Sequence, residues 1–392
     1  MEEKKVPKLR FKGFVQEWEQ RKLGEVVKIN GRIGFRGYTQ ADIIRKEDGG
    51  ILAFSPTNII NNKLDFNVKN TYITKDKYYE SPEIMVKNGD ILFVKTGSTL
   101  GKSASVSNLN EEATINPQIV ILRATSYFIS EFISSYLISN NILKQVAQTR
   151  IGGAVPTLTE TEIKRFQISA PKGKEQQKIG TLFKQLDDTI ALHQRKIEQL
   201  KLLKQAFLQK MLANQENVPE LRFADFDVYW EQHTLGETTD IGTGRDYKHL
   251  KSGNIPVYGT GGYMLSVDDA LSFDKDAIGI GRKGTIDNPY ILKAPFWTVD
   301  TLFYVIPRNG NEIDFFYSVF QKINWKSKDE STGVPSLSKS TINSILVYAP
   351  SKDEQKKIGA FFKYFDENIL IHQHKVNLLK QLKKAFLQKM FI

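Results

Sequence analysis

A 37-residue segment that occurs twice constrains this chain more than any other feature. The first copy runs from Glu175 to Met211 and the second from Glu354 to Met390, and 22 of the 37 aligned positions are identical. Neither copy contains a proline, and their frequent Lys, Gln and Leu residues are good helix formers. Each copy therefore predicts one long helix that starts soon after Pro171 or Pro350. Its length would be roughly 55 Å at 1.5 Å per residue.

Apolar residues recur in both copies at alternating steps of four and three, which is the pattern of a two-stranded coiled coil. One histidine and one lysine interrupt each seam at matched places. We interpret these as devices that fix the register, because no ligand cluster at metal-binding spacing accompanies the histidines. We expect the two helices to pair antiparallel about a pseudo-two-fold axis, with His193 and His372 close together. The predicted seam is Ile179, Phe183, Leu186, Ile190, His193, Ile197, Leu200, Lys204, Phe207 and Met211, and then Ile358, Phe362, Phe365, Ile369, His372, Val376, Leu379, Lys383, Phe386 and Met390.

Two shorter repeats show that the whole chain is a tandem duplication. Residues 6–25 match 218–237, and residues 155–171 match 334–350, where a Thr- or Ser-rich start predicts a capped short helix followed by a strand. Trp and Leu residues at such matched spacing indicate packing rather than a binding site.

Between these repeats lie two bodies, roughly 26–154 and 238–333, without sustained similarity to each other. Both mix β-like runs, Gly- and Asn-rich turns and helix-like stretches. The predicted fold class is therefore α+β, with two globular domains joined by two long antiparallel coiled-coil helices. The expected boundaries are 1–172 for the first domain, 173–213 for the central helix, 214–351 for the second domain and 352–392 for the C-terminal helix.

Composition narrows the function. The net charge of +11 indicates a polyanion as partner, with nucleic acid as the first choice. The chain has no cysteine, which excludes disulfides and thiolate chemistry and suits the cytoplasm. The sequence contains no apolar signal core and no apolar run of about 18 residues, so we expect a cytoplasmic protein outside the membrane.

Motifs of catalysis are missing or out of context. Residues 279–284 read G-x-G-x-x-G, but a turn and a strand should follow, not the helix that a dinucleotide site requires. Residues 287–290 (DNPY) lack the first proline of an amino-methyltransferase motif. There is no phosphate-binding G-x-x-x-x-G-K-[ST] loop, and the five histidines show no metal spacing. We therefore expect no catalytic residues, no metal and no bound cofactor.

Loops that mix basic, hydroxyl and glycine residues are the candidate binding elements. Glycine lets a backbone approach a ligand closely, and Arg, Lys, Ser and Thr can bond phosphates or base edges. The alternative interpretation is an ordinary hairpin with solvated cations. The candidate DNA-binding residues are Arg32, Arg36, Tyr38, Lys95, Thr96, Ser98, Lys102 and Arg150 in the first body, and Arg245, Tyr247, Lys248, Arg282, Lys283 and Thr285 in the second.

The ordered set of repeats resembles the specificity subunit of type I restriction-modification systems. The resemblance rests on the L-R-F…W…L-G-E opening, the V-P-x-L segment ending in Ala-Pro and the E-Q-x-K-I-G helix, each present twice, and it covers the whole chain. It implies that each body is a target-recognition domain for one half of an asymmetric bipartite DNA sequence. It also implies that the helix pair sets the half-site spacing and docks two methylation subunits.

The same resemblance implies that two restriction subunits join the complex and that S-adenosylmethionine, ATP and Mg²⁺ are bound by partner subunits rather than by this chain. Two other functions remain open from the residues alone. One is a stand-alone DNA adenine methyltransferase, against which the missing motifs speak. The other is a helical adaptor that binds only protein, which leaves the +11 charge unexplained.

Overall fold

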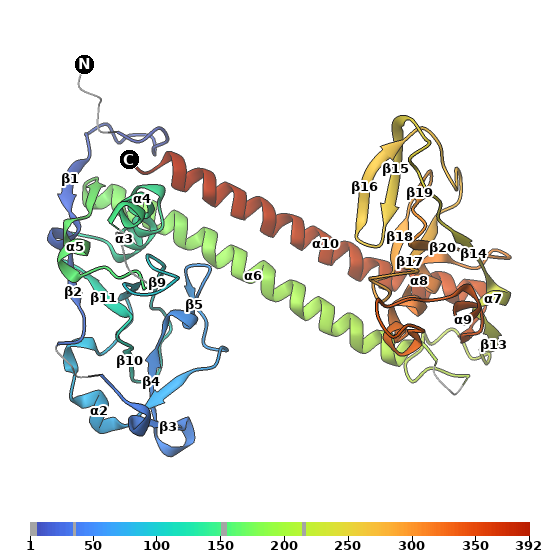
Figure 1. Ribbon diagram of the computed structural model, residues 1–392, viewed down its shortest axis with the longest axis horizontal. Coiled ribbons are helices and arrows are strands. Elements are labelled where there is room, and N and C mark those ends of the chain that lie inside the picture. Colours follow the sequence, from blue (N-terminus) through green and yellow to red (C-terminus); the bar gives the residue numbers. More distant parts are fainter. Residues whose placement is uncertain (1–5, 34–36, 150–154, 214–216) are drawn as a thin grey trace. The chain divides into compact units, whose positions relative to one another are not determined.

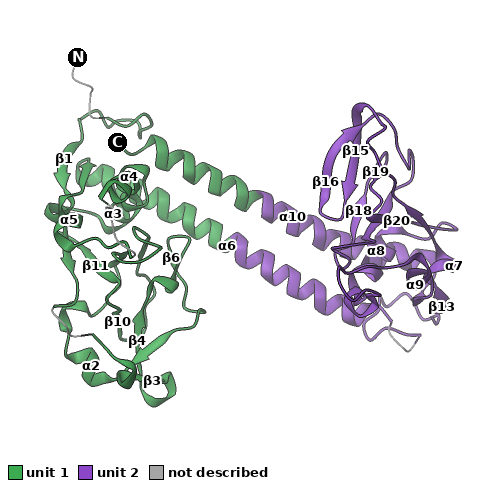
Figure 2. Cartoon of the chain, in the orientation of Figure 1, with its two compact units in different colours: residues 1–192, 375–392 green, residues 193–374 purple. Residues whose placement is uncertain are grey.

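The structure is a computed structural model that describes residues 6–33, 37–149, 155–213 and 217–392 (Figure 1). The chain divides into two compact units, unit 1 with residues 1–192 and 375–392 and unit 2 with residues 193–374 (Figure 2). The boundary cuts both long helices, α6 (Gly173–Met211) and α10 (Lys352–Lys389). Each unit therefore contains half of each helix together with one body.

Unit 1 holds two four-stranded sheets beside a two-stranded ribbon. The ribbon pairs β1 (Glu19–Lys22) with β12 (Gln167–Ala170). The first sheet has the order β2 (Val27–Asn30), β11 (Ile119–Ala124), β8 (Ile91–Val94) and β9 (Ser103–Ser105), all antiparallel. The second has the order β10 (Ala113–Ile115), β4 (Ile51–Phe54), β7 (Thr71–Ile73) and β3 (Ile43–Ile44), with β10 and β4 parallel. A hairpin of β5 (Ile59–Ile60) and β6 (Lys63–Leu64) and the helices α1 (Leu23–Val26), α2 (Lys75–Tyr79), α3 (Ser130–Leu137), α4 (Asn140–Thr149) and α5 (Glu160–Arg165) complete it.

Unit 2 repeats this plan with one strand fewer in its second sheet. Its ribbon pairs β13 (Glu231–Thr234) with β21 (Leu346–Ala349). Its first sheet has the order β14 (Thr239–Thr243), β20 (Leu302–Pro307), β17 (Ala277–Gly281) and β18 (Tyr290–Leu292). The second has the order β16 (Gly262–Val267), β15 (Ser252–Gly259) and β19 (Trp297–Thr298), with β15 and β19 parallel. The helices are α7 (Leu235–Thr238), α8 (Ile313–Lys322) and α9 (Lys339–Asn343).

The two bodies thus share a fold that their sequences do not reveal. The first sheets correspond strand for strand: β2 with β14, β11 with β20, β8 with β17 and β9 with β18. Each second sheet contains one parallel pair, β10 beside β4 in unit 1 and β19 beside β15 in unit 2. A core of this kind requires apolar side chains of suitable volume rather than particular ones, so the fold survives when the sequences diverge.

The repeated segments form the cores, as predicted from their spacing. Trp18 and Trp230 are 2% and 3% exposed, and each meets a phenylalanine edge-on, Phe132 at 6.0 Å and Phe315 at 5.8 Å between ring centroids. Ile179 of α6 lies in the core of unit 1, and its counterpart in α10 lies in that of unit 2. Each body is therefore built onto the first turns of one long helix.

The predicted capped helices are also present. The Thr159 hydroxyl accepts a bond from the Glu162 backbone N–H at the start of α5, and the Ser338 hydroxyl accepts one from the Thr341 N–H at the start of α9. Each side-chain cap satisfies a backbone donor that the first helical turn leaves without an intrahelical partner. The strands β12 and β21 follow and end at Ala-Pro, as expected.

The long helices pair antiparallel, as predicted. In unit 1, Asp187 of α6 accepts from the Lys383 ammonium of α10 at 2.7 Å. In unit 2, Lys204 of α6 lies 2.5 Å from Asp366 of α10. From the first contact to the second, the residue number in α6 increases while the residue number in α10 decreases, so the two helices run antiparallel. The two contacts are the same contact made twice, because Asp187 matches Asp366 and Lys204 matches Lys383 in the repeat.

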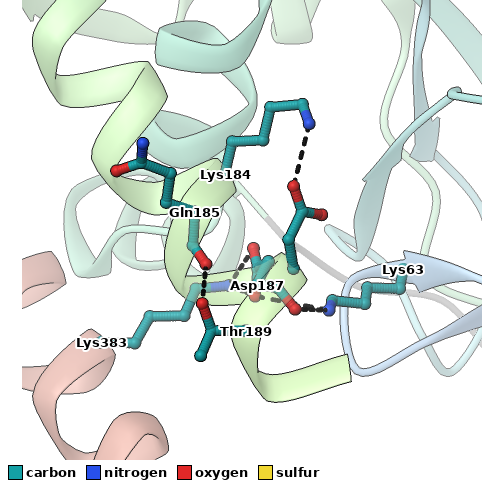
Figure 3. Close-up of polar contacts among 7 residues, drawn as sticks. Lys63, Lys184, Gln185, Asp187, Thr189 and Lys383 are labelled. Atoms are coloured by element: carbon teal, nitrogen blue, oxygen red, sulfur yellow. Dashed lines mark hydrogen bonds and ion pairs between the residues drawn. The ribbon is translucent and has the colours of Figure 1, made fainter. Parts of the chain in front are cut away.

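The seam positions lie between the helices. The structure buries or half-buries every one of them, and the two seam lysines use their ammonium groups on the ion pairs just described. Figure 3 shows Asp187 between Lys383 and Lys63, the first residue of β6 in the β5–β6 hairpin. The body of unit 1 therefore also touches the helix pair through this hairpin.

Candidate nucleic-acid interface

The turns that follow β8 and β17 occupy the same place in the two bodies. The first carries Lys95, Thr96 and Ser98, and the second carries Arg282, Lys283 and Thr285. Each turn pairs with the repeated V-P-x-L segment through an isolated bridge, Thr96 with Thr157 and Lys283 with Ser336. Both turns are therefore fixed to the framework rather than free to swing.

Matching backbone hydrogen bonds hold the two turns. The Gly97 N–H donates to the Pro156 carbonyl at 2.9 Å, and the Gly284 N–H donates to the Pro335 carbonyl at 2.8 Å. Both glycines have positive φ, 108° and 96°. Because that region is open to glycine and strained for most other residues, the sequence similarity of the two turns has a backbone cause.

The structure brings the other candidate loop of each body to the same edge. In unit 2 the backbone N–H of Arg245 donates to the Thr298 carbonyl at 2.8 Å. The backbone N–H of Arg282 donates to the Thr301 carbonyl, also at 2.8 Å. The connection between β19 and β20 thus lies between the two loops. In unit 1 the Lys95 N–H donates to the Gln118 carbonyl at 2.8 Å, and Arg32 donates to the Ile115 carbonyl at 3.2 Å.

Most candidate side chains of unit 2 face solvent. The exposed ones are Arg245, Lys248, Arg282, Lys283 and Thr285 in unit 2, and Ser98 and Lys102 in unit 1. The half-buried ones are Lys95, Thr96, Tyr247, Arg32 and Tyr38. Arg36 and Arg150 lie outside the described residues.

Arg32 differs from the other candidates because it packs onto its own unit. Its guanidinium lies 5.1 Å from the Tyr38 ring centroid. Burial lowers the pKa of Arg32, and Tyr38 opposes this shift electrostatically. The group remains charged, since an arginine is not deprotonated in proteins. Its placement indicates that it shapes the loop in which the sequence predicted a DNA contact.

The comparison with known protein families decides what this framework is. The profile of the type I restriction modification DNA specificity domain matches twice, at residues 15–202 and 228–381. The chain belongs to the type I restriction-modification DNA specificity family. Each match contains one body and most of one long helix, so the two domains of this specificity subunit are the two halves of the duplication.

Individual relatives match this chain over different shares of its length. The putative type I restriction enzyme MjaX specificity subunit of Methanocaldococcus jannaschii is 22% identical over 95% of this chain and 92% of its own length. The MjaVIII specificity subunit of the same organism is 21% identical over 57% of this chain and 52% of its own length. The crystal structure of the type I S subunit from M. genitalium matches with a TM-score of 0.71 and 16% identity, covering 99% of each chain. A second structure, from a study of complex assembly in the type I restriction-modification system, has a TM-score of 0.51 and 16% identity over 94% of this chain and 96% of its own.

Sequence reasoning missed three residues near the candidate loops of this specificity subunit. Gln118 is exposed beside the first turn, and its amide is 3.4 Å from the position that a Cβ on Gly97 would take. The Asp300 carbonyl accepts from the Arg282 guanidinium at 3.2 Å. Tyr263 is 63% exposed in the hairpin β15–β16, whose tip residue Thr260 approaches Gly284. The Asn-Pro-Gln run at 116–118 was a visible turn signal.

The side chains of these loops are of types that can take part in DNA recognition. Arg and Lys side chains can bond guanine edges or phosphates, and Gln can bond adenine. Among the described residues no three His, Cys, Asp or Glu side chains gather as a metal site would require. Within the same residues no helix is long and apolar enough to cross a membrane.

Proposed function

We propose that this specificity subunit is the DNA-reading part of a type I restriction-modification complex and has no catalytic role of its own. Each unit reads one half of an asymmetric bipartite target through the loops described above. The observation that carries the proposal is the pair of equivalent turns, 95–98 and 282–285. Equivalent backbone bonds hold them in both units, yet they present different side chains. A framework that repeats while its exposed residues change is suited to reading two different sequences.

The helix pair is proposed to set the spacing between the half-sites. Helix α6 continues for 39 residues, which is roughly 58 Å at 1.5 Å per residue. This exceeds one turn of B-DNA, about 34 Å. Two ion pairs and the His pair fix its register with α10, so the spacer would have one defined length.

Exposed apolar residues on both helices support docking of two methylation subunits. Leu192 and Leu202 of α6 are 58% and 67% exposed, and Leu370 and Leu378 of α10 are 51% and 65% exposed. Large apolar side chains that stay in water along a helix are typical of protein-binding surfaces. In this proposal the methylation subunits carry S-adenosylmethionine, and the two restriction subunits carry ATP and Mg²⁺. The assembled complex acts in the cytoplasm.

The test compares matched double substitutions in the two turns. The chain is combined with its methylation subunits, and methylated adenines are mapped across genomic DNA. Arg282→Ala with Lys283→Ala should relax one half of the recognised sequence, and Lys95→Ala with Thr96→Ala should relax the other half. Removing a side chain that bonds a base edge should reduce discrimination by about 1–3 kcal/mol, or roughly 5- to 150-fold.

Two outcomes would contradict the proposal. Methylation that keeps its full sequence requirement in both variants would contradict the assignment of the two turns. Methyl transfer by the purified chain alone would replace the proposal with the enzyme alternative.

A further inference from the structure

A basic cavity lies in unit 1, and its lining contains none of the candidate DNA-binding residues. Its volume is about 240 Å³. The α10 helix supplies most of its wall, and the tip of the β5–β6 hairpin and the junction between α3 and α4 supply the rest. The lining residues are Asn62, Ile138, Asn140, Lys380, Lys383, Lys384, Leu387 and Gln388.

The lining carries positive charge and hydrogen-bond donors, and it includes no carboxylate. Three of its eight residues are lysines, and three more are amides. Lys383 donates to Asp187 at 2.7 Å, while Lys380 and Lys384 are exposed. Two exposed cations flanked by amides match an oxyanion, because ammonium and amide N–H groups all donate to the same oxygens.

A fourth lysine adds to this positive charge. Lys63 donates to the Asp187 backbone carbonyl at 2.6 Å and lies 3.8 Å from its carboxylate (Figure 3). Burial lowers the pKa of Lys63, Asp187 opposes the shift, and the charges of Lys383 and Lys380 lower the pKa further. Asp187 thus faces two lysines, and the cluster as a whole repels additional cations.

The corresponding place in unit 2 is built differently. The match of Lys384 in the helix repeat is Gln205, and Lys204 donates there to Gln321 and Asp366. The helix at the unit 2 site thus has one lysine fewer, and the side-chain amide of Gln321 joins the ion pair there. The charge cluster is a property of unit 1 and does not follow from the duplication.

The size of the cavity limits its occupant. Pockets that enclose drug-sized ligands measure about 300–1,000 Å³, whereas one water takes about 30 Å³ of liquid. The cavity is about half open, so its volume of about 240 Å³ takes one charged group while the rest of a larger molecule can stay outside.

We propose that this cavity is a phosphate-binding site in which Lys380 and Lys384 bind the oxyanion and Asn62, Asn140 and Gln388 orient it. The phosphate belongs either to the backbone of duplex DNA or to a small phosphate such as pyrophosphate. Bound anion offsets the repulsion among the four lysines, so it also stabilises the contact between hairpin and helix.

The experiment uses the full chain with Lys380→Gln and Lys384→Gln. The matched control is Lys196→Gln with Lys201→Gln, which removes two charges from exposed positions of α6. Pyrophosphate binding is measured by calorimetry, and binding to duplex DNA is measured by anisotropy over a series of salt concentrations. Thermal unfolding of both variants checks that the fold is intact, and the exposed positions should leave it unchanged.

Either of two results would support the site, and each identifies a different source of the phosphate. If the phosphate is a DNA phosphate, the slope of log K against log salt becomes shallower by about 0.9 for each phosphate that is no longer neutralised, in the cavity variant only. If it is a small phosphate, the slope is unchanged and pyrophosphate binding weakens about tenfold, again in the cavity variant only. Equal behaviour of the cavity variant and the control in both measurements overturns the proposal. Half-site discrimination should persist in either case, so this outcome is separate from the test of target reading.

Discussion

His193 and His372 are 179 positions apart in the chain, and their Nδ1 atoms lie 2.9 Å from each other. The ring centroids are 5.0 Å apart with planes inclined by 37°. One nitrogen must donate and the other accept, so the pair forms only with complementary protonation of the two rings. Because both rings interrupt apolar seams, a slipped pairing would set each histidine against Ile, Leu or Val and break this bond. The pair is therefore a register lock.

The lock predicts a coupling between the two histidines. His193→Leu should lower the free energy of unfolding by about 1 kcal/mol, because it removes the hydrogen-bond partner of His372. The double change His193→Leu with His372→Leu should recover that loss, since two apolar residues suit the seam. A double-mutant cycle from urea unfolding measures the coupling energy, expected at about 2 kcal/mol, because each single substitution costs about 1 kcal/mol and the double substitution costs almost nothing. Additive effects of the two substitutions would show that the histidine pair does not stabilise the register.

The two interhelical ion pairs should also respond differently from surface pairs. Lys204 is 6% exposed, and burial lowers its pKa while Asp366 opposes the shift. Asp366→Asn would leave the buried ammonium with a neutral partner, at a cost of about 2 kcal/mol, less than for a fully buried pair because Asp366 is partly exposed. Exchanging the partners, Lys204→Asp with Asp366→Lys, should restore part of the loss.

Chemical denaturation of the two variants tests this pair, and Lys184→Ala provides the control. Lys184 forms a pair with Asp188 within one helix, and both side chains are more than half exposed. Its removal should change the free energy of unfolding by less than about 0.5 kcal/mol. Equal losses at Lys184 and at Asp366 would mean that burial does not strengthen the interhelical pair.

Lys322 predicts a pH dependence at alkaline pH. Its ammonium donates to the carbonyls of Leu212 and Ala213 just past the end of α6, and burial lowers the pKa of Lys322 to about 8. An unfolded lysine holds its proton to about pH 10.4, so unfolding takes up a proton between these two values. The free energy of unfolding contributed by this group therefore rises as pH increases from about 8 to about 10. Below about pH 8 both states are protonated and the contribution is constant.

The measurement is urea unfolding at a series of pH values from about 7 to about 9 for the unaltered chain and for Lys322→Met, a range that spans the lowered pKa. The free energy of unfolding should increase less steeply with pH in Lys322→Met, because the variant lacks the proton that Lys322 takes up on unfolding. Lys326→Met serves as the control, because that lysine is 76% exposed in its side chain. If the Lys322→Met and Lys326→Met curves are parallel, the proton uptake belongs to other groups.

The turn of unit 2 predicts the effect of a single methyl group. A Cβ on Gly281 would lie 1.9 Å from the Thr285 carbonyl oxygen, so Gly281→Ala must displace the turn that carries Arg282 and Lys283. We expect DNA affinity to fall about tenfold or more for targets read by unit 2, with the reading of the other half-site retained. Gly333→Ala, where a Cβ would meet nothing within 4 Å, should leave both half-sites unaffected. Competition binding with targets altered in one half measures the difference.

The sequence predicted the helix pair in detail because repetition and periodicity carry that information locally. The step pattern places Ile179 or Phe183 on the seam without knowledge of any distant residue. The common fold of the bodies was not predictable in this way, since β8 and β17 share only their apolar character. Strand order depends on pairing between distant segments, and a single sequence does not encode it in any short window.

The candidate site was likewise predictable in its local features but not in its long-range contacts. The basic and glycine-rich loops were visible as composition, but their convergence was not. It depends on backbone bonds from Arg245 and Arg282 to one connection, and almost any residue type can donate such bonds. Arg32 shows the converse case, because its residue type suggested DNA while its guanidinium contacts Tyr38 and Ile115. Residue type predicts what a side chain can bind, and the fold decides what it reaches.

The helix pair finally predicts how the spacing between half-sites can be changed. Seven residues inserted after Leu192 in α6 and seven after Gln373 in α10 preserve the seam, because seven is one heptad. Both insertion points lie between the Asp187–Lys383 ion pair and the histidine pair, so both ion pairs and the histidine bond can still form. Each helix lengthens by about 10.5 Å, which corresponds to about three base pairs at 3.4 Å. Methylation mapping should then show a spacer longer by about three base pairs with unchanged half-sites.

An insertion in α10 alone distinguishes a change of the half-site spacing from a general loss of stability. It shifts Lys383 relative to Asp366 while α6 keeps its length, so the two interhelical ion pairs cannot form together. This single insertion should destabilise the chain and abolish methylation, whereas the matched double insertion should remain folded and active. If the double insertion is active at the original spacing, the helices do not determine the distance between the half-sites.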